Sequence, residues 1–193
     1  MFRAMNLLNA RSVGVLVVLC FSLLGSGLAE ATIIPVFDKS ALFSRADLVL
    51  EISVGNSKAL RAGPNGFIHT DHKVVVDRIW HARGAALRVR PGDELSLRQI
   101  GGRLGDLEHS VVGTAPIAQG DRLLVFARYE AGRIFLVGMG QGALLFMKQG
   151  EKTFVAGMFG ARPALRKGVP VGEDLELVRG LLKALVAKSK VSP

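Results

Sequence analysis

Two histidines, His69 and His72, have the best spacing in the chain for binding a metal ion. Positions three apart on a β-strand face opposite sides of the strand, so both imidazoles could reach one ion only from a loop. His81 and His109 are isolated, and neither a cysteine nor a carboxylate completes a ligand set. We therefore predict surface histidines, with no metal site and no cofactor.

Side chains that could act as nucleophiles or general acids lack the sequence context that such catalysis requires. The G-x-S-x-G pattern of a nucleophile elbow is absent around Ser44, Ser53 and Ser57. Expected turns carry the carboxylates Asp93, Glu94, Asp106, Glu108 and Asp121. Paired-carboxylate catalysis needs two such groups a few ångströms apart, which only the fold can decide. We predict no catalytic residue and no enzyme activity; a hydrolase-type site assembled by the fold is an alternative.

The glycine-rich run Gly138-Met139-Gly140-Gln141-Gly142 looks like a phosphate-binding loop. It lacks the Lys-Ser/Thr pair and the helix that follow such a loop. Because it lies between two expected strands, we predict a tight link or a bulge there.

The composition is basic, with 25 Lys and Arg against 16 Asp and Glu and a formal net charge of +9. Such a surface favours anionic partners, for example nucleic acid, lipid headgroups or acidic glycans. The basic residues are scattered, however, and the chain has one Trp and one Tyr. Nucleic-acid platforms combine basic residues with stacking rings, so the composition argues against nucleic acid as the partner.

Residues 1–31 have the pattern of a secretory signal peptide. Arginines precede an apolar run at 13–24, and small residues follow it. We predict cleavage after Ala31, with cleavage after Ala29 or an uncleaved anchor helix as alternatives. The protein is then exported, either to the periplasm or out of the cell.

The only cysteine, Cys20, lies inside the apolar run and follows Leu19. A lipoprotein signal has Gly or Ala directly before its cysteine, so lipidation is not expected. The mature chain, 32–193, would be free of disulfides and of any cysteine-based zinc site. Its length suffices for one domain held by its hydrophobic core.

The clearest structural pattern is a pair of strands at 72–80 and 94–100. The first is rich in valine and the second alternates apolar and polar residues, as half-buried strands do. The turn Pro91-Gly92-Asp93 precedes the second strand. Alternation breaks at the end of the first strand, which predicts a bulge or a strand end near 77–78. We expect the two strands to lie side by side, joined by a long basic loop.

Further expected strands lie at 48–54, 111–116, 122–128, 133–137, 143–147 and 153–156. We expect loops at 55–66 and 101–110, and a hairpin that joins 122–128 to 133–137. An apolar stripe at helical spacing predicts a helix at 173–190, which caps the barrel or, alternatively, contacts a membrane surface or a partner. The fold class is therefore mainly β: a small antiparallel OB-like Greek-key barrel, or a sandwich, with a C-terminal capping α-helix, in the single domain 32–193.

Four short motifs stand in a suggestive order: Ala46-Asp47-Leu48-Val49-Leu50; a strand ending Ile79-Trp80, with Gly84 soon after; Gly92-Asp93 before a strand; and Gly120-Asp121-Arg122-Leu123-Leu124-Val125-Phe126. Over residues 40–147 the chain resembles a group of uncharacterised exported bacterial proteins. It more distantly resembles the netrin-like modules of tissue inhibitors of metalloproteinases, which implies a five- or six-stranded OB-type Greek-key barrel. The inhibitor activity is not implied, because it needs an amino-terminal cysteine on zinc and disulfides, and the mature chain has neither.

Together these observations predict an exported, non-enzymatic binding domain. Its partner would be a protein of the cell envelope or the extracellular space, bound through an open barrel edge or a loop face. An alternative is a basic surface that binds anionic lipid or glycan through scattered Arg and Lys side chains. The hydrolase-type enzyme is the second alternative.

Overall fold

The computed structural model describes residues 34–62, 66–164 and 172–191. Its elements belong to one compact unit, Pro35–Pro193. The predicted signal segment 1–31 lies outside the described residues. In chain order the elements are α2 (Lys39–Arg45), β1 (Leu48–Arg61), β2 (Ile68–Ala82), η1 (Gly84–Arg88), β3 (Glu94–Ile100), β4 (Gly102–Leu104), β5 (Leu107–His109), β6 (Arg122–Glu130), β7 (Arg133–Leu136), η2 (Met139–Gly142), β8 (Ala143–Gln149), β9 (Lys152–Gly157), β10 (Glu173–Asp174) and α3 (Leu175–Val191).

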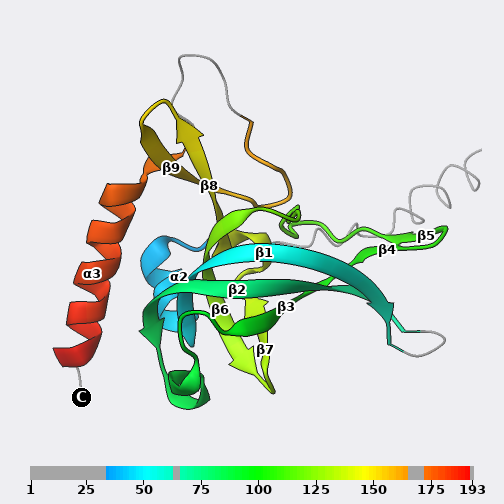
Figure 1. Ribbon diagram of the computed structural model, residues 1–193, viewed down its shortest axis with the longest axis horizontal. Coiled ribbons are helices and arrows are strands. Elements are labelled where there is room, and N and C mark those ends of the chain that lie inside the picture. Colours follow the sequence, from blue (N-terminus) through cyan, green and yellow to red (C-terminus); the bar gives the residue numbers. More distant parts are fainter. Residues whose placement is uncertain (1–33, 63–65, 165–171, 192–193) are drawn as a thin grey trace, which may run out of the picture. The chain divides into compact units, whose positions relative to one another are not determined.

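Five strands close a small barrel (Figure 1). They pair in the order β1-β2-β3-β7-β6, and β6 closes the barrel by pairing with β1. These pairs are antiparallel except β3 and β7, which run parallel. The strand order confirms the predicted mainly β barrel and is compatible with an OB-type barrel; the parallel pair is a feature that the sequence did not predict.

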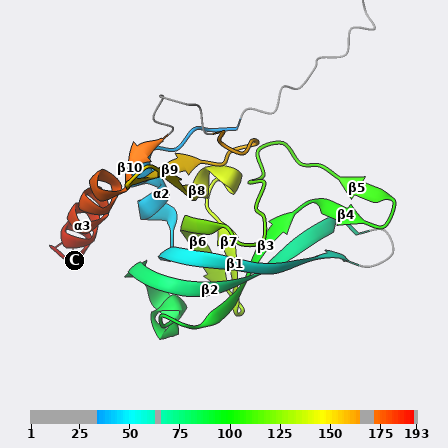
Figure 2. The same cartoon turned by 45° about the horizontal axis from the view of Figure 1, so that its top comes forward.

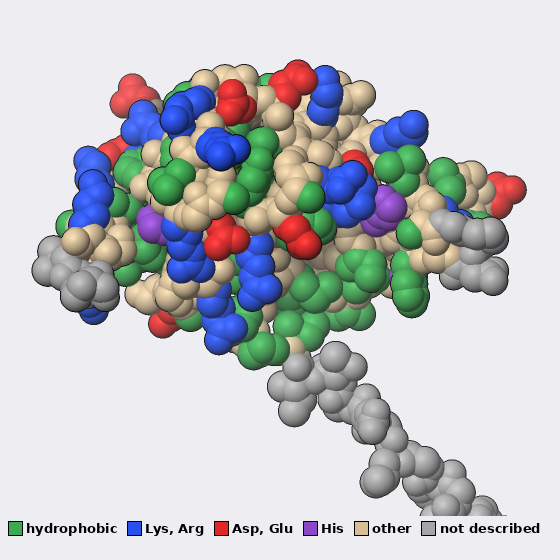
Figure 3. All heavy atoms as spheres, turned by 90° about the horizontal axis from the view of Figure 1, so that it is seen from below, with side chains coloured by type: hydrophobic (Ala, Val, Ile, Leu, Met, Phe, Trp, Pro, Cys, Tyr) green, Lys and Arg blue, Asp and Glu red, His purple; other side chains and the backbone are tan. Residues whose placement is uncertain are grey.

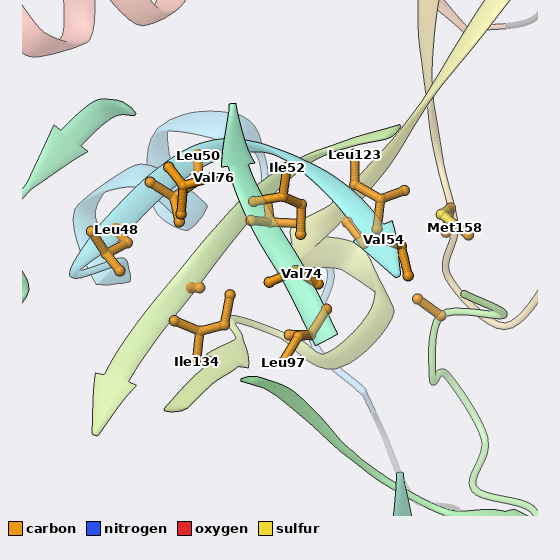
Figure 4. Close-up of a cluster of buried hydrophobic side chains, with 14 of the residues drawn as sticks. Leu48, Leu50, Ile52, Val54, Val74, Val76, Leu97, Leu123, Ile134 and Met158 are labelled. Carbon is orange, nitrogen blue, oxygen red and sulfur yellow. The ribbon is translucent and has the colours of Figure 1, made fainter. Parts of the chain in front are cut away.

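The barrel interior is filled by alternate side chains of β1 and by their neighbours (Figure 4). Leu48, Leu50 and Ile52 are fully buried inside the barrel, whereas Val49 and Glu51 belong to its outer side. This is the alternation of a strand whose two faces meet different surroundings. The same inner cluster contains, from the other barrel strands, Val74, Val76, Leu97, Leu123 and Ile134.

A second apolar cluster lies between the outer side of the barrel and two helices. The sheet continues from β6 through β8 and β9 to β10, and α2 and α3 lie beside this extension (Figure 2). Leu175, Val178 and Leu182 of α3 join Val49 and Phe126 of the barrel in this cluster. The predicted C-terminal helix is therefore confirmed, and its apolar stripe is the part that packs. No helix in the described ranges is long and apolar enough to cross a membrane.

β2 and β3 confirm the predicted central pair. β3 has the predicted bounds and runs antiparallel to β2. The bulge is also where the broken alternation placed it: Glu51 lies opposite Arg78 and Ile52 opposite Val76, so Asp77 is the extra residue.

Three local predictions are wrong. β1 continues to Arg61, into the expected loop 55–66, because β2 starts earlier than expected and supplies pairing partners. Residues 101–110 form the β4–β5 hairpin rather than a loop, with Gly105 at φ +61 in its turn. Residues 111–116 are not a strand, because their peptide groups bond instead to η2 and to the segment after β9.

Candidate functional site

The parallel pairing of β3 with β7 forms a short seam in the barrel, and a cavity opens where this seam ends. β3 and β7 pair only at Ser96 with Arg133 and at Leu97 with Ile134. Beyond these pairs, the ends of both strands line a cavity of about 480 Å³. We call it the seam cleft; its lining consists of Ala62, Gly66, Phe67, Ile68, His69, Arg98, Gln99, Ile100, Thr114, Phe135, Leu136 and Met139.

The lining of the seam cleft is mainly apolar. Phe135 and Leu136 come from β7, Ile100 comes from β3, Ile68 is the first residue of β2, and Phe67 directly precedes it. Phe67 is 70% exposed and Ile100 is 45% exposed, so the apolar lining reaches solvent. Large apolar side chains that gather on a surface mark sites of binding.

Two polar features lie within this apolar lining. Arg98 makes two hydrogen bonds of 2.6 Å to Asp71 on the neighbouring strand. This pairing lowers the pKa of Asp71 and raises the pKa of Arg98. The Nε2 atom of His69 is shielded from solvent and has no hydrogen-bond partner among the described residues. A buried polar atom left unpaired costs about 1–3 kcal/mol.

A second cavity, of about 330 Å³, adjoins the seam cleft. It shares Gln99, Ile100 and Thr114 with the cleft. We call it the polar pocket because its lining includes Ser57, Thr70, His72, Gln99, Arg103, Glu108, His109 and Ser110. Figures 1 and 2 show the β4–β5 hairpin, which carries part of this lining, on the side of the barrel away from α3.

Ser57 of β1 and His72 of β2 face each other in the polar pocket. They are partners in the strand register, and Ser57 Oγ lies 2.7 Å from His72 Nδ1. His72 is buried, whereas Ser57 is exposed. Burial lowers the pKa of His72, against the opposing effect of a hydrogen bond with the Gln99 side chain. The imidazole is therefore neutral at about pH 7, and Nδ1 can accept the serine proton.

Acid is expected to destabilise the fold through His72. Its folded-state pKa lies below the ordinary value of 6.5, so the unfolded chain takes up the proton first. The full stability is present above pH 6.5 and falls as the pH drops from there through the folded-state pKa, by up to about 1.4 kcal/mol per pH unit from one such site. Urea unfolding at about pH 7.5 and about pH 5.5 measures this difference. His72→Gln should reduce it; an unchanged difference in that variant would assign the acid sensitivity to other groups, such as His81, whose pKa is also lowered by burial.

The structure separates the two histidines that the sequence singled out. His69 lines the seam cleft, and His72 lies among the buried residues of the polar pocket. The prediction of surface histidines is wrong for His72, because the segment that follows β5 covers this end of the barrel wall. His81 packs on Phe43, with 4.7 Å between the ring centroids. In the ranges that the structure describes, no three His, Cys, Asp or Glu side chains are placed to hold a metal ion together.

Of the three candidate serines, Ser57 is the one that is hydrogen-bonded to a histidine. Ser44 donates to a helix carbonyl, and Ser53 donates to Asp77 at 2.8 Å. Three of the five candidate carboxylates have separate partners: Asp93 accepts from the Arg90 backbone, Glu94 pairs with Lys73, and Asp121 pairs with Arg162. Glu108 lines the polar pocket, and Asp106 lies in the β4–β5 turn.

The glycine-rich run forms a tight link, as predicted. Gly138 has φ +64, and η2 follows it directly before β8. The side chain of Gln141 in this link accepts from the Phe37 backbone and donates to the Pro35 carbonyl, at 2.8 Å each. These two hydrogen bonds therefore attach the start of the compact unit to the glycine-rich run.

Sequence reasoning missed Glu51, which lies on the outer side of β1 and is almost fully buried. It accepts hydrogen bonds from Trp80 Nε1 at 3.1 Å and from Arg179 of α3 at 3.0 and 3.2 Å. The one available signal was a charged residue within the apolar start of the strand, Leu48–Ile52.

No known protein family, curated protein or solved structure compared with this chain matches it.

Proposed function

We propose that the chain is a binding domain whose ligand is a small apolar or amphiphilic molecule held in the seam cleft. The supporting observation is the cavity of about 480 Å³ with its apolar lining. Small-molecule sites usually measure ~300–1,000 Å³ and combine an apolar lining with a few polar groups that fix orientation. Arg98 and His69 are such groups in this cleft, so they favour a ligand with one polar end.

The position of the cleft in the barrel supports the same proposal. In OB-type barrels the second and third strands and the connection between the first and second strands form a frequent binding surface. The seam cleft is lined by the start of β2, the end of β3 and residues next to the β1–β2 connection.

An envelope or extracellular protein is the second candidate ligand, and the exposed apolar side chains around the cleft favour it. Phe67, Ile100, Leu104 and Leu107 are all exposed at this end of the barrel. A protein that inserted an apolar side chain into the seam cleft would exclude a small molecule from it. A competition experiment for the cleft can therefore distinguish the small molecule from the partner protein as the ligand.

The basic surface supports the remaining alternative, anionic lipid or glycan, less well. Figure 3 shows Lys and Arg side chains spread over one face with Asp and Glu side chains among them. Several arginines are paired with carboxylates, including Arg83 with Asp47 and Arg98 with Asp71. Paired and dispersed cations give a weaker local field than a single basic patch.

Ile100→Lys is expected to weaken binding of an apolar probe by at least about 10-fold, because it puts a charged group on the lining of an apolar site. The probe is the dye N-phenyl-1-naphthylamine, whose fluorescence rises in apolar surroundings. Titration of the full chain with the dye gives the dissociation constant. Because Ile100 is an exposed residue, the substitution should leave the fold intact.

Leu87→Lys is the matched control. Leu87 is an exposed apolar residue of η1, 59% exposed, and it does not line the seam cleft. Leu87→Lys adds the same charge as Ile100→Lys. Dye that binds elsewhere on the chain gives the same background signal in the parent and in both variants. Equal dye affinity in the parent, Ile100→Lys and Leu87→Lys would overturn the proposal. A partner protein that displaces the dye from the parent would identify the second candidate as the ligand.

A further inference from the structure

The seam cleft and the polar pocket are neighbouring cavities with different chemical characters. Gln99, Ile100 and Thr114 line both cavities. The cleft supplies an apolar lining, and the pocket supplies hydroxyl, imidazole and charged groups. A molecule that fits both has an apolar chain joined to a polar group.

The polar group of such a molecule would meet a serine that is hydrogen-bonded to a histidine. Ser57 Oγ and His72 Nδ1 are 2.7 Å apart, which is within the range of nucleophile and base pairs. Ser57 is exposed, so a substrate can reach its oxygen, whereas His72 is buried behind it. Burial also keeps the imidazole in the neutral form that a general base requires, since it lowers the pKa of His72.

A third side chain lies beside the base. Gln99 lines the polar pocket with His72 and raises its pKa, and in the amide orientation that satisfies both of its ends it bonds to the Ala115 peptide group at 3.1 Å twice. An oriented base behind a serine is the general arrangement of nucleophilic hydrolases, in which the third group can be neutral. Gln99 is here a positioning residue.

We infer that Ser57 and His72 form the nucleophile and general base of a site that hydrolyses esters with an apolar acyl chain, and that the acyl chain occupies the seam cleft. The inference rests on the proposed function for the binding of that chain. It adds a reaction to the binding site and selects carboxylic esters as the ligand class.

The reaction balances with water as the only co-reactant. Ser57 Oγ attacks the ester carbonyl and forms an Oγ–C bond, while its proton passes to His72 Nδ1. The ester C–O bond then breaks, and the proton from His72 goes to the departing alcohol. Water attacks the acyl-serine as His72 takes one of its protons, the Oγ–C bond breaks, and the proton returns to Ser57. The products are an alcohol and a carboxylic acid.

Hydrogen-bond donors for the negative oxygen of the tetrahedral intermediate are present in the same lining. Arg103 and Ser110 both line the polar pocket. A guanidinium or hydroxyl near that oxygen stabilises the intermediate more than the neutral ester.

An alkyl fluorophosphonate, which forms a stable bond with activated serines, tests the site in the full chain. We expect a phosphonyl adduct on Ser57, located by mass spectrometry of peptides, and no adduct in Ser57→Ala. Ser53→Ala is the matched control, because Ser53 lies on the same strand but donates to Asp77.

In a second experiment, the rate of hydrolysis of p-nitrophenyl octanoate should fall roughly 100-fold in Ser57→Ala and in His72→Gln.

Ile100→Lys separates this inference from the proposed function. It should slow hydrolysis of the octanoate ester more than hydrolysis of the acetate ester, because only the octanoate has a chain to place in the cleft. Dye binding to the cleft without an adduct on Ser57 would overturn the hydrolase inference and leave the binding function standing. An adduct on Ser57 together with no dye binding would reject the cleft as the ligand site, and with it the predicted preference for long acyl chains. Ser57 is exposed, so Ser57→Ala should fold even if His72→Gln does not.

Discussion

Arg179→Met is expected to lower the free energy of unfolding by about 3 kcal/mol, because it leaves the carboxylate of Glu51 buried without its main partner. Arg179 reaches Glu51 from α3 with hydrogen bonds of 3.0 and 3.2 Å, and the Glu51 side chain is 3% exposed. The loss should stay below the largest values for buried pairs, because Trp80 still donates to Glu51 and Arg122 lies 3.7 Å away. The helix that packs over this carboxylate should loosen first.

Guanidinium unfolding of the parent protein and of Arg179→Met measures the change in the free energy of unfolding. Lys183→Met is the matched control. Lys183 is an exposed residue on the same helix, so its loss should change stability by less than about 0.5 kcal/mol. The double variant Glu51→Gln with Arg179→Met should be more stable than Arg179→Met alone, since the buried charge is gone and an oxygen remains for Trp80. An Arg179→Met protein as stable as Lys183→Met would mean that Glu51 is hydrated when α3 is in place.

Glu51 shows why this part of the structure could not be predicted from the sequence. Residues 48–54 were expected to form a strand, and alternation along a strand puts Glu51 on the face opposite Leu50 and Ile52. Local pattern alone then assigns a glutamate on such a face to solvent. It is buried because α3, 128 residues later, lies over it, and only the three-dimensional fold contains that information.

The parts of the fold that the sequence did predict are those that local chemistry decides. Strand alternation gave β3, the break in alternation gave the bulge at Asp77, and helical spacing gave α3. Barrel closure is different, because the parallel pairing of β3 with β7 joins segments that no turn connects. The 101–110 hairpin was missed because glycine and charge suggest a loop even where strands pair.

The candidate site depends on register, which explains why the sequence did not reveal it. Ser57 and His72 are 15 residues apart and become neighbours only because β1 and β2 pair beyond the expected strand ends. The seam cleft likewise exists because β3 and β7 part after two residue pairs. Motif searches look for short spacings along the chain, so a site of this kind carries no sequence signature.

Gly142→Ala is expected to destabilise the protein by about 3 kcal/mol, at the upper end of the usual cost of overpacking. A Cβ atom at Gly142 would lie 2.5 Å from the Val137 carbonyl oxygen, 2.8 Å from that of Phe126 and 3.0 Å from the Val137 nitrogen. All three are backbone atoms, and the Val137 N–H donates to the Phe126 carbonyl at 2.9 Å. The added methyl group would therefore push against a hydrogen bond that fixes the end of β7 to β6.

Gly157→Ala is the matched control, because a Cβ there meets no atom within 4 Å. In a strand, alanine in place of glycine should be neutral or stabilise the fold by about 0.5 kcal/mol, since the unfolded chain loses freedom. Urea unfolding of both variants gives the comparison. If Gly142→Ala proved as stable as Gly157→Ala, the η2 link could move away from β6 without cost. Close packing would then not explain the glycine at position 142.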